Sequence, residues 1–321
     1  MRLYVTGAGG FVGRHVTRAL RERGADVRDE RIDVLDGVAL ERVLAGCDAL
    51  VHVAALYSYD APPAALEHVN VEGTRRVLAA AMRAGIRRIV VTSTAGTCGP
   101  VAGRAATEED AAPAWELAIP YKRTKLAAER LALAAGAVVV NPTAPVGEGD
   151  VRPSPTGRMV AGVARGRLRG YVARTGLNVV DVHDVALGHA LALEHGRAGE
   201  RYLLGGVDFW LGDLFATIAA IAGRRRPRIR VPYVAARAAA SLGLLNRHEV
   251  TLARLPMFFS SAKAERDLGY RPGPVEPALA RAVHEALARG SRNALELYLA
   301  RAREIRKAAS ARPEPAIPSR T

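Results

Sequence analysis

A tyrosine and a lysine four residues apart, Tyr121 and Lys125, could carry proton transfer in this chain. On a helix, residues at this spacing share one face. A nearby ammonium lowers the pKa of a phenol, so Tyr121 could exchange a proton with a substrate oxygen while a hydride moves. Lysine supplies only four of the 46 basic residues, which favours a role for a compact ammonium at position 125.

Two neighbouring hydroxyl side chains, Ser93 and Thr94, follow an apolar run at residues 88–92. A hydroxyl at the end of a buried strand can hydrogen-bond a substrate oxygen. Serine and threonine in this position also commonly cap a helix or close a turn. Both residues are candidates for orienting the reacting oxygen, with a structural role as the alternative.

A glycine-rich segment at residues 6–13, TGAGGFVG, lies at the beginning of the chain. Gly7, Gly10 and Gly13 follow an expected strand and open an expected helix. The first glycine permits a tight turn, the second lets the backbone approach a pyrophosphate, and the third lets the helix pack on the strand. The first N–H groups of that helix, at Phe11 and Val12, would face the phosphates. The segment predicts a dinucleotide-binding loop.

The elements that must position these residues alternate along the chain. Four strands are expected, at residues 2–6, 49–53, 88–92 and 137–140. Five helices are expected, at residues 11–23, 64–84, 121–135, 211–222 and 275–289. Strands that alternate with helices predict an α/β fold with a parallel sheet covered on both faces. Prolines 142, 145, 153 and 155 mark a change of composition near residue 142, where a second lobe would begin.

The composition is that of a globular protein, with 321 residues, 49% hydrophobic and 24% charged. No window has the run of about 18 apolar residues that a membrane span needs. The glycine cluster also interrupts the apolar core that a signal peptide would need at the N-terminus. We therefore expect a cytoplasmic protein. The two cysteines, Cys47 and Cys98, are too few for a disulfide framework or a structural zinc site, and no metal is expected.

The formal net charge of +14 raises the question of an anionic partner. The arginines are spread along the chain except for the run 224–226, and aromatic residues make up only 5%. Base stacking needs aromatic side chains, so we do not expect nucleic acid as a partner. An anionic cofactor, an anionic substrate or a membrane surface fits the charge. Residues 293–309 show a basic amphipathic pattern that could contact the inner membrane, with a surface helix and a tail as the alternative.

The three motifs together resemble the extended branch of the short-chain dehydrogenase/reductase superfamily, that of the NAD-dependent epimerases and dehydratases. The resemblance covers residues 1–290. It implies a doubly wound Rossmann domain with a smaller C-terminal substrate lobe. Tyr121 would be the general acid/base, Lys125 would lower its pKa and hold the nicotinamide ribose, and Thr94, or else Ser93, would orient the reacting oxygen. The cofactor-binding residues that it implies are Gly7, Gly10, Phe11, Val12, Gly13, Arg28, Asp33, Val34, Ala54, Ala55, Lys125, Pro142 and Thr143.

A narrower resemblance lies in the variable half of the chain. Four stretches, at residues 141–159, 175–196, 199–206 and 257–272, are similar to the hopanoid-associated sugar epimerase family. That resemblance implies a role in hopanoid lipid biosynthesis. Nucleotide-sugar members of the superfamily usually carry an asparagine two residues after the proline of 142, where this chain has Ala144. This departure counts against a nucleotide-sugar substrate.

The ribose loop after the second strand is short, and it mixes acidic and basic residues. An acidic residue at the end of that strand favours NAD, whereas an arginine favours NADP. The alignment places Arg28 at this position, so NAD(P) is expected with a preference for NADP(H).

The expected domain boundaries follow from the resemblance to the superfamily. We expect the Rossmann domain at residues 1–142, with residues 176–197 returning to it. The substrate lobe would take residues 143–175 and 198–290, and residues 291–321 would form a basic helix and tail. Helices 64–84 and 121–135 could also form a homodimer interface.

The expected function is NAD(P)-dependent hydride transfer at a secondary alcohol or carbonyl carbon of a small, sugar-like or polyol substrate that a lipid could carry. One alternative is a sugar epimerase or dehydratase that keeps its NAD bound. The other is a cofactor-binding sensor or scaffold without catalysis, which would usually lack the tyrosine or the lysine.

Overall fold

The structure is a computed structural model, which describes residues 1–289. The predicted helix at 293–309 and the tail at 291–321 lie outside the described residues. Among residues 1–289, no helix combines the length and the apolar character needed to cross a bilayer.

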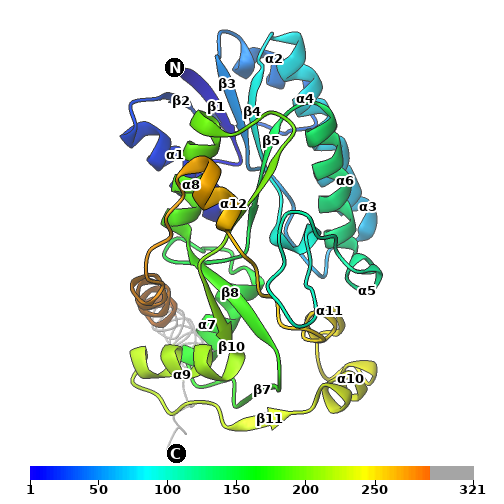
Figure 1. Cartoon of the computed structure of the whole chain (residues 1–321), viewed down its shortest axis with the longest axis vertical. Helices are drawn as coiled ribbons and strands as arrows, with labels where there is room; N and C mark the ends of the chain where they lie inside the picture. The colour runs from blue at the N-terminus through cyan, green and yellow to red at the C-terminus, as the bar shows by residue number, and fades with distance from the viewer. Residues whose placement is uncertain (290–321) are drawn as a thin grey trace, which may run out of the picture.

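A parallel sheet of six strands organises the first lobe, in the order β2-β1-β3-β4-β5-β9 (Figure 1). The strands are β1 (Arg2–Thr6), β2 (Asp26–Arg28), β3 (Ala49–His52), β4 (Arg88–Thr92), β5 (Val138–Pro142) and β9 (Arg201–Leu204). Every neighbouring pair runs parallel. The chain leaves β1 toward β2 and returns on the other side to β3, so the strand order reverses at β1. In doubly wound sheets, ligands bind at this point, beyond the carboxyl ends of the strands.

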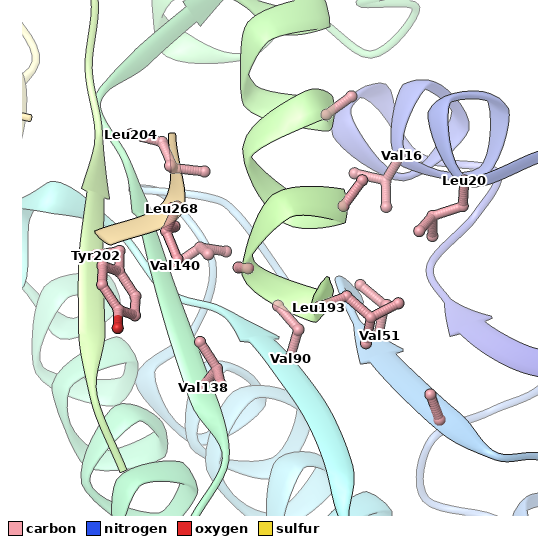
Figure 2. Close-up of a cluster of buried hydrophobic side chains, with 14 of the residues drawn as sticks. Val16, Leu20, Val51, Val90, Val138, Val140, Leu193, Tyr202, Leu204 and Leu268 are labelled. Atoms are coloured by element: carbon pink, nitrogen blue, oxygen red, sulfur yellow. The ribbon is translucent and has the colours of Figure 1, made fainter. Parts of the chain in front are cut away.

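Helices cover both faces of this sheet. On one face lie α1 (Phe11–Glu22), α8 (Val182–His195) and α12 (Ala262–Leu268), and on the other lie α2 (Gly37–Leu44), α4 (Gly73–Arg83) and α6 (Pro120–Ala134). Figure 2 shows the first core, where Val16 and Leu20 of α1 and Leu193 of α8 meet strand residues such as Val51 and Val90. The apolar runs of the strands are buried on both sides, which is why they show no alternation.

Shorter elements follow the strand ends. The segment after β3 forms α3 (Pro63–Leu66) and a π-helix, η1 (Glu67–Glu72), before α4. The segment after β4 forms a 3-10 turn, η2 (Ala95–Thr97), and then α5 (Ala114–Leu117). The predicted single helix at 64–84 is therefore a chain of three helical pieces.

The second lobe contains two small sheets. Strands β6 (Ala144–Val146), β8 (Gly176–Asp181) and β10 (Val207–Trp210) form one, and β7 (Gly170–Val172) and β11 (Ile229–Val231) form the other. Helices α7 (Pro155–Ala164), α9 (Leu211–Ile221), α10 (Tyr233–Ser241), α11 (Arg247–Leu252) and a helix at residues 276–289 complete the lobe. Its core joins α7, α9 and the helix at 276–289.

The return to the Rossmann sheet differs from the expected segment at 176–197. Residues 176–181, as β8, pair with β6 and β10 in the second lobe. The return is made by α8, which lies within the expected segment and packs on α1, and by β9, which lies beyond it and pairs with β5. Tyr202 and Leu204 of β9 have no exposed surface, and they pack with α12 in the core on this face of the sheet.

Candidate active site

The glycine loop has the backbone shape that a pyrophosphate needs. Gly7 has φ +69°, and a Cβ there would lie 2.7 Å from the backbone of Ala54. A Cβ at Gly13 would lie 2.1 Å from the carbonyl oxygen of Gly7, so the helix can approach the strand only without a side chain. Space around Gly9 is open, and Gly10 begins α1 with no side chain capping its N–H groups. The loop therefore fits a dinucleotide phosphate group, with the N–H groups of α1, from Phe11 and Val12 onward, available to it.

The residues expected beside adenine and its ribose lie at the same edge of the sheet. Asp33 is exposed and accepts a hydrogen bond from the Leu35 N–H at 3.0 Å, while Val34 is buried against α4. The Ala54 N–H donates to the Thr6 hydroxyl at 3.1 Å, and Ala55 is exposed. The loop after β3 is thus fixed from β1.

Arg28 is held by neighbouring groups. It is the last residue of β2 and pairs in register with Tyr4, three residues before Gly7. Its guanidinium donates to Glu30 Oε1 at 3.0 Å and to the Ala45 carbonyl at 3.3 Å. Among residues 1–289, Arg31 is exposed and forms no ion pair.

Tyr121 and Lys125 lie on the first turns of α6, which begins at Pro120. Lys125 donates from Nζ to the Thr92 carbonyl at 2.8 Å, which ties it to the end of β4. The Tyr121 ring packs on Tyr57, with centroids 4.6 Å apart. Both motif residues are buried, so the helix presents them inward at the carboxyl edge of the sheet.

The two groups have shifted pKa values. Burial lowers the pKa of Lys125 to about 8. Burial, with the neighbouring Tyr57 phenol, raises the pKa of Tyr121 well above its ordinary value. The sequence predicts the opposite direction for Tyr121, because it considers the lysine but not the removal of water from the phenol. The buried position therefore favours the neutral phenol of Tyr121 over the phenolate.

The two candidate hydroxyls occupy different environments. Thr94 lines a large cavity together with Tyr121. Ser93 points the other way and donates to Glu129 at 2.5 Å. Glu129 also accepts from Thr97 at 2.7 Å and from Arg201 at 2.8 Å. The geometry therefore brings Thr94, and not Ser93, to the site, while Ser93 belongs to a buried network between β4, α6 and β9.

The cavity has a volume of about 540 Å³ and lies between the two lobes. Tyr121, Thr94 and Thr143 line one end, and most of the rest is apolar. Those apolar residues include Met159, Leu177, Phe215, Val231, Ala236, Leu245, Val250 and Met257. Pro142 ends β5 beside Leu204, and the Thr143 that follows it has a buried hydroxyl without a partner among the described residues. Ala144 also lines this wall.

A buried ion pair lies next to Tyr121. Lys122 Nζ lies 2.9 Å from Glu116 Oε1, and the two side chains are 4% and 0% exposed. Lys122 lines the cavity, and Gly96 makes room for it, because a Cβ there would lie 1.8 Å from Nζ. Burial raises the pKa of Glu116, and Lys122 opposes that rise. Sequence reasoning missed this pair, although a second lysine within YKRTK was the available signal.

A second polar group, also missed, joins the lobes behind α1. Arg281 donates to Glu148 at 2.6 Å and to Asp181 at 2.5 Å. The Glu148 carboxylate also lies 2.9 Å from His183, whose ring packs near His15 of α1. Ligand atoms of His15, Glu148 and His183 lie within 4.8 Å of one another. The Arg281 guanidinium already neutralises the Glu148 carboxylate at this distance. The group therefore holds the two lobes together by ion pairs and is not a site for a second cation.

Comparison with known proteins gives consistent matches. The model of the NAD dependent epimerase/dehydratase family matches residues 3–205. A Synechocystis protein provisionally named dihydroflavonol 4-reductase is 35% identical, over 88% of this chain and 93% of its own length. Sterol demethylase protein B of Methylococcus capsulatus is 32% identical, over 88% of this chain and 97% of its own length.

The solved structures agree with these relatives. One of them is described as a nucleoside-diphosphate-sugar epimerase from Pseudomonas aeruginosa, and it has a TM-score of 0.77 at 27% identity. The match covers 90% of this chain and 98% of that one. The similarity therefore includes both lobes and the cleft between them.

Proposed function

Because the chain belongs to the NAD-dependent epimerase/dehydratase family, we propose that it is an NAD(P)-dependent oxidoreductase for a largely apolar alcohol or ketone. We infer the substrate class from the cavity of about 540 Å³, which joins the region of Tyr121 to an apolar chamber in the second lobe. A pocket of this size can hold a polycyclic or isoprenoid body with one oxygenated end.

The oxygenated end would lie against the polar wall made by Tyr121, Thr94 and Lys122. This arrangement is compatible with a sugar-like or polyol group carried by a lipid such as a hopanoid. Two further facts support an apolar body: Ala144 offers no amide to a nucleotide diphosphate, and a relative carries a sterol-related name.

The chain's own residues divide the chemistry between them. When bound, the nicotinamide cofactor supplies or accepts the hydride at the reacting carbon. In reduction, Tyr121 donates its phenolic proton to the carbonyl oxygen, and Thr94 donates a hydrogen bond that holds this oxygen in place. Lys125, fixed by the Thr92 carbonyl, would hold the nicotinamide ribose. The glycine loop and α1 would bind the pyrophosphate.

We place ketone reduction ahead of alcohol oxidation because the Synechocystis relative is provisionally named a reductase.

The test begins with the cofactor. The purified protein is denatured, and any released nucleotide is identified by mass spectrometry; protein without nucleotide is titrated with NADPH and NADH. We expect an empty site that binds NADPH and reduces apolar ketones such as decalones. Tyr121→Phe should abolish turnover and keep cofactor binding. Full activity in that variant, or binding of neither nucleotide, would contradict the proposal.

A second candidate is an epimerase that oxidises and re-reduces one substrate, and the match to the Pseudomonas epimerase structure favours it. It predicts near-stoichiometric NAD in the purified protein, so the same measurement separates the two candidates.

The preference for NADP(H) rests on Arg31. Asp29 and Glu30, the acidic residues of this loop, are paired with Arg21 and Arg28. An exposed arginine beside two neutralised carboxylates favours the 2′-phosphate of NADP. Arg31→Ala should weaken binding of NADPH and leave that of NADH unchanged, and equal effects on both would reject this role. The homodimer through α4 and α6 also remains a proposal, tested by light scattering.

A further inference from the structure

The far end of the second lobe carries an apolar patch that the fold leaves uncovered. The exposed side chains of Val234, Leu242, Leu244 and Leu245, on α10 and the turn after it, are called the leucine patch below. Three of them are at least 73% exposed, and Leu245 is 45% exposed. Helix α10 turns Ala236 and Ala240 inward, which leaves Val234 and Leu242 on its outer side. Figure 1 places α10 and β11 at the end of the molecule away from the main sheet.

The segment at residues 224–247, which includes the leucine patch, also carries seven arginines that form no ion pair within the described residues. They are Arg224, Arg225, Arg226, Arg228, Arg230, Arg237 and Arg247, and all seven are exposed. Between Asp213 and Glu249 the chain has no acidic residue. Within the described residues, none of the seven forms an ion pair, whereas Arg23, Arg28 and Arg104 elsewhere are paired with carboxylates. This end of the molecule is therefore both apolar and positively charged.

The patch is continuous with the substrate cavity. Leu245 and Ala236 line the cavity from the side that carries the patch, and Asn246 and Val250 line it next to them. Leu245 belongs both to the patch and to the cavity wall, and α10 packs on α11 through Ala236, Ala240 and Val250. The segment that presents leucines outward therefore also forms part of the cavity wall.

We propose that this surface docks on an anionic lipid bilayer and receives an apolar substrate from it. Exposed leucines that enter the acyl boundary, with arginines at the level of the headgroups, are the pattern of an interfacial membrane contact. Arginines near an anionic surface add attraction that falls with salt. The inference takes its apolar substrate from the proposed function, but vesicle binding needs no turnover, so the two can fail separately.

The test is cosedimentation of the full chain with vesicles of phosphatidylglycerol and phosphatidylcholine, and with vesicles of phosphatidylcholine alone. We expect binding to the anionic vesicles that weakens with salt. Leu242→Ser with Leu244→Ser should weaken it at least about tenfold, because two apolar side chains lose their burial. The matched control is Val38→Ser, which changes an apolar residue of the first lobe that is 80% exposed, and it should bind as the wild type does.

A third variant, Arg237→Gln with Arg247→Gln, should lower the affinity for anionic vesicles about fivefold for each arginine that reaches the lipid surface. Light scattering accompanies each sample. Three results overturn the inference: no binding to anionic vesicles, unchanged binding in the double leucine variant, or a wild-type dimer that this variant dissolves, since the patch would then cover a second copy. Patch-dependent vesicle binding without turnover of any ketone would leave the inference standing and refute the proposed function.

Discussion

Replacement of Lys122 by methionine should expose the cost of the buried carboxylate at Glu116. Glu116 has no exposed side-chain surface, and the ammonium 2.9 Å away is its only ion-pair partner in the described part of the chain. Removal of one partner of a buried pair costs about 3–5 kcal/mol, because the remaining charge is left without compensation. At about 2 °C for each kcal/mol, the melting temperature should fall by roughly 6–10 °C.

The penalty should depend on pH in a defined direction. Burial raises the pKa of Glu116 in the folded protein, and Lys122 opposes that rise, so the variant loses the opposing charge. A group with a raised folded pKa stabilises the fold at low pH, and this stability is lost as the pH rises through the folded pKa. The variant should therefore be closest to the wild type in acid. The penalty should grow as the pH rises above the ordinary range of a glutamate, by about 1.4 kcal/mol for each pH unit over which the carboxyl is ionised in the wild type and still protonated in the variant.

Calorimetry at several pH values measures both effects. Arg83→Met is the matched control, because its ion pair with Glu41 is 3.0 Å long but more than half exposed, and its loss should cost less than about 1 kcal/mol. Lys122→Met combined with Glu116→Gln should recover much of the lost stability. A single variant as stable as the control, or a penalty that does not change with pH, would refute the reasoning.

Three further predictions concern the site. Gly13→Ala should abolish NAD(P) binding, because its Cβ would lie 2.1 Å from the Gly7 carbonyl oxygen, whereas Gly9→Ala, in open space, should bind normally in a fluorescence titration. Thr94→Val should lower kcat about 100-fold and leave the melting temperature unchanged. Ser93→Ala should lower the melting temperature and leave kcat unchanged, and equal losses of kcat in the two variants would contradict this division. Because burial lowers the pKa of Lys125 to about 8, kcat/KM should fall as the pH rises past that value, and a rate that still increases there would show that the ammonium is not required.

The sequence predicts the parts of the fold that depend on local pattern. The strands at 2–6 and 88–92 and the helix at 121–135 are found within a residue of their expected ends, because each is a short apolar run or a periodic segment between turn signals. The glycine loop is also local, since its spacing alone specifies the approach of helix to strand. The family was predictable for the same reason, and the comparisons confirm it.

The sequence does not predict what depends on distant partners. Glu116 and Lys122 are six residues apart, but their pairing depends on the turn into α6 and on the space that Gly96 leaves. The raised pKa of Tyr121 comes first from burial and then from Tyr57, which arrives from the loop after β3. The place of β9 depends on α12, more than 55 residues later, covering Tyr202. None of these contacts leaves a repeat or a spacing in the chain.

The arginines count equally in the composition, but they differ in the structure in whether a carboxylate lies beside them. Their spread along the chain looks like a general preference for arginine over lysine. Many arginines of the first lobe fit that interpretation, since Arg2, Arg23 and Arg76 each lie against a carboxylate and contribute little net field. Arg237 and Arg247 form no ion pair within the described residues, and they lie in the same segment as leucines that the core does not use. A charge that is balanced within the fold needs no partner, so the unbalanced arginines at one end identify the surface where an outside partner is expected.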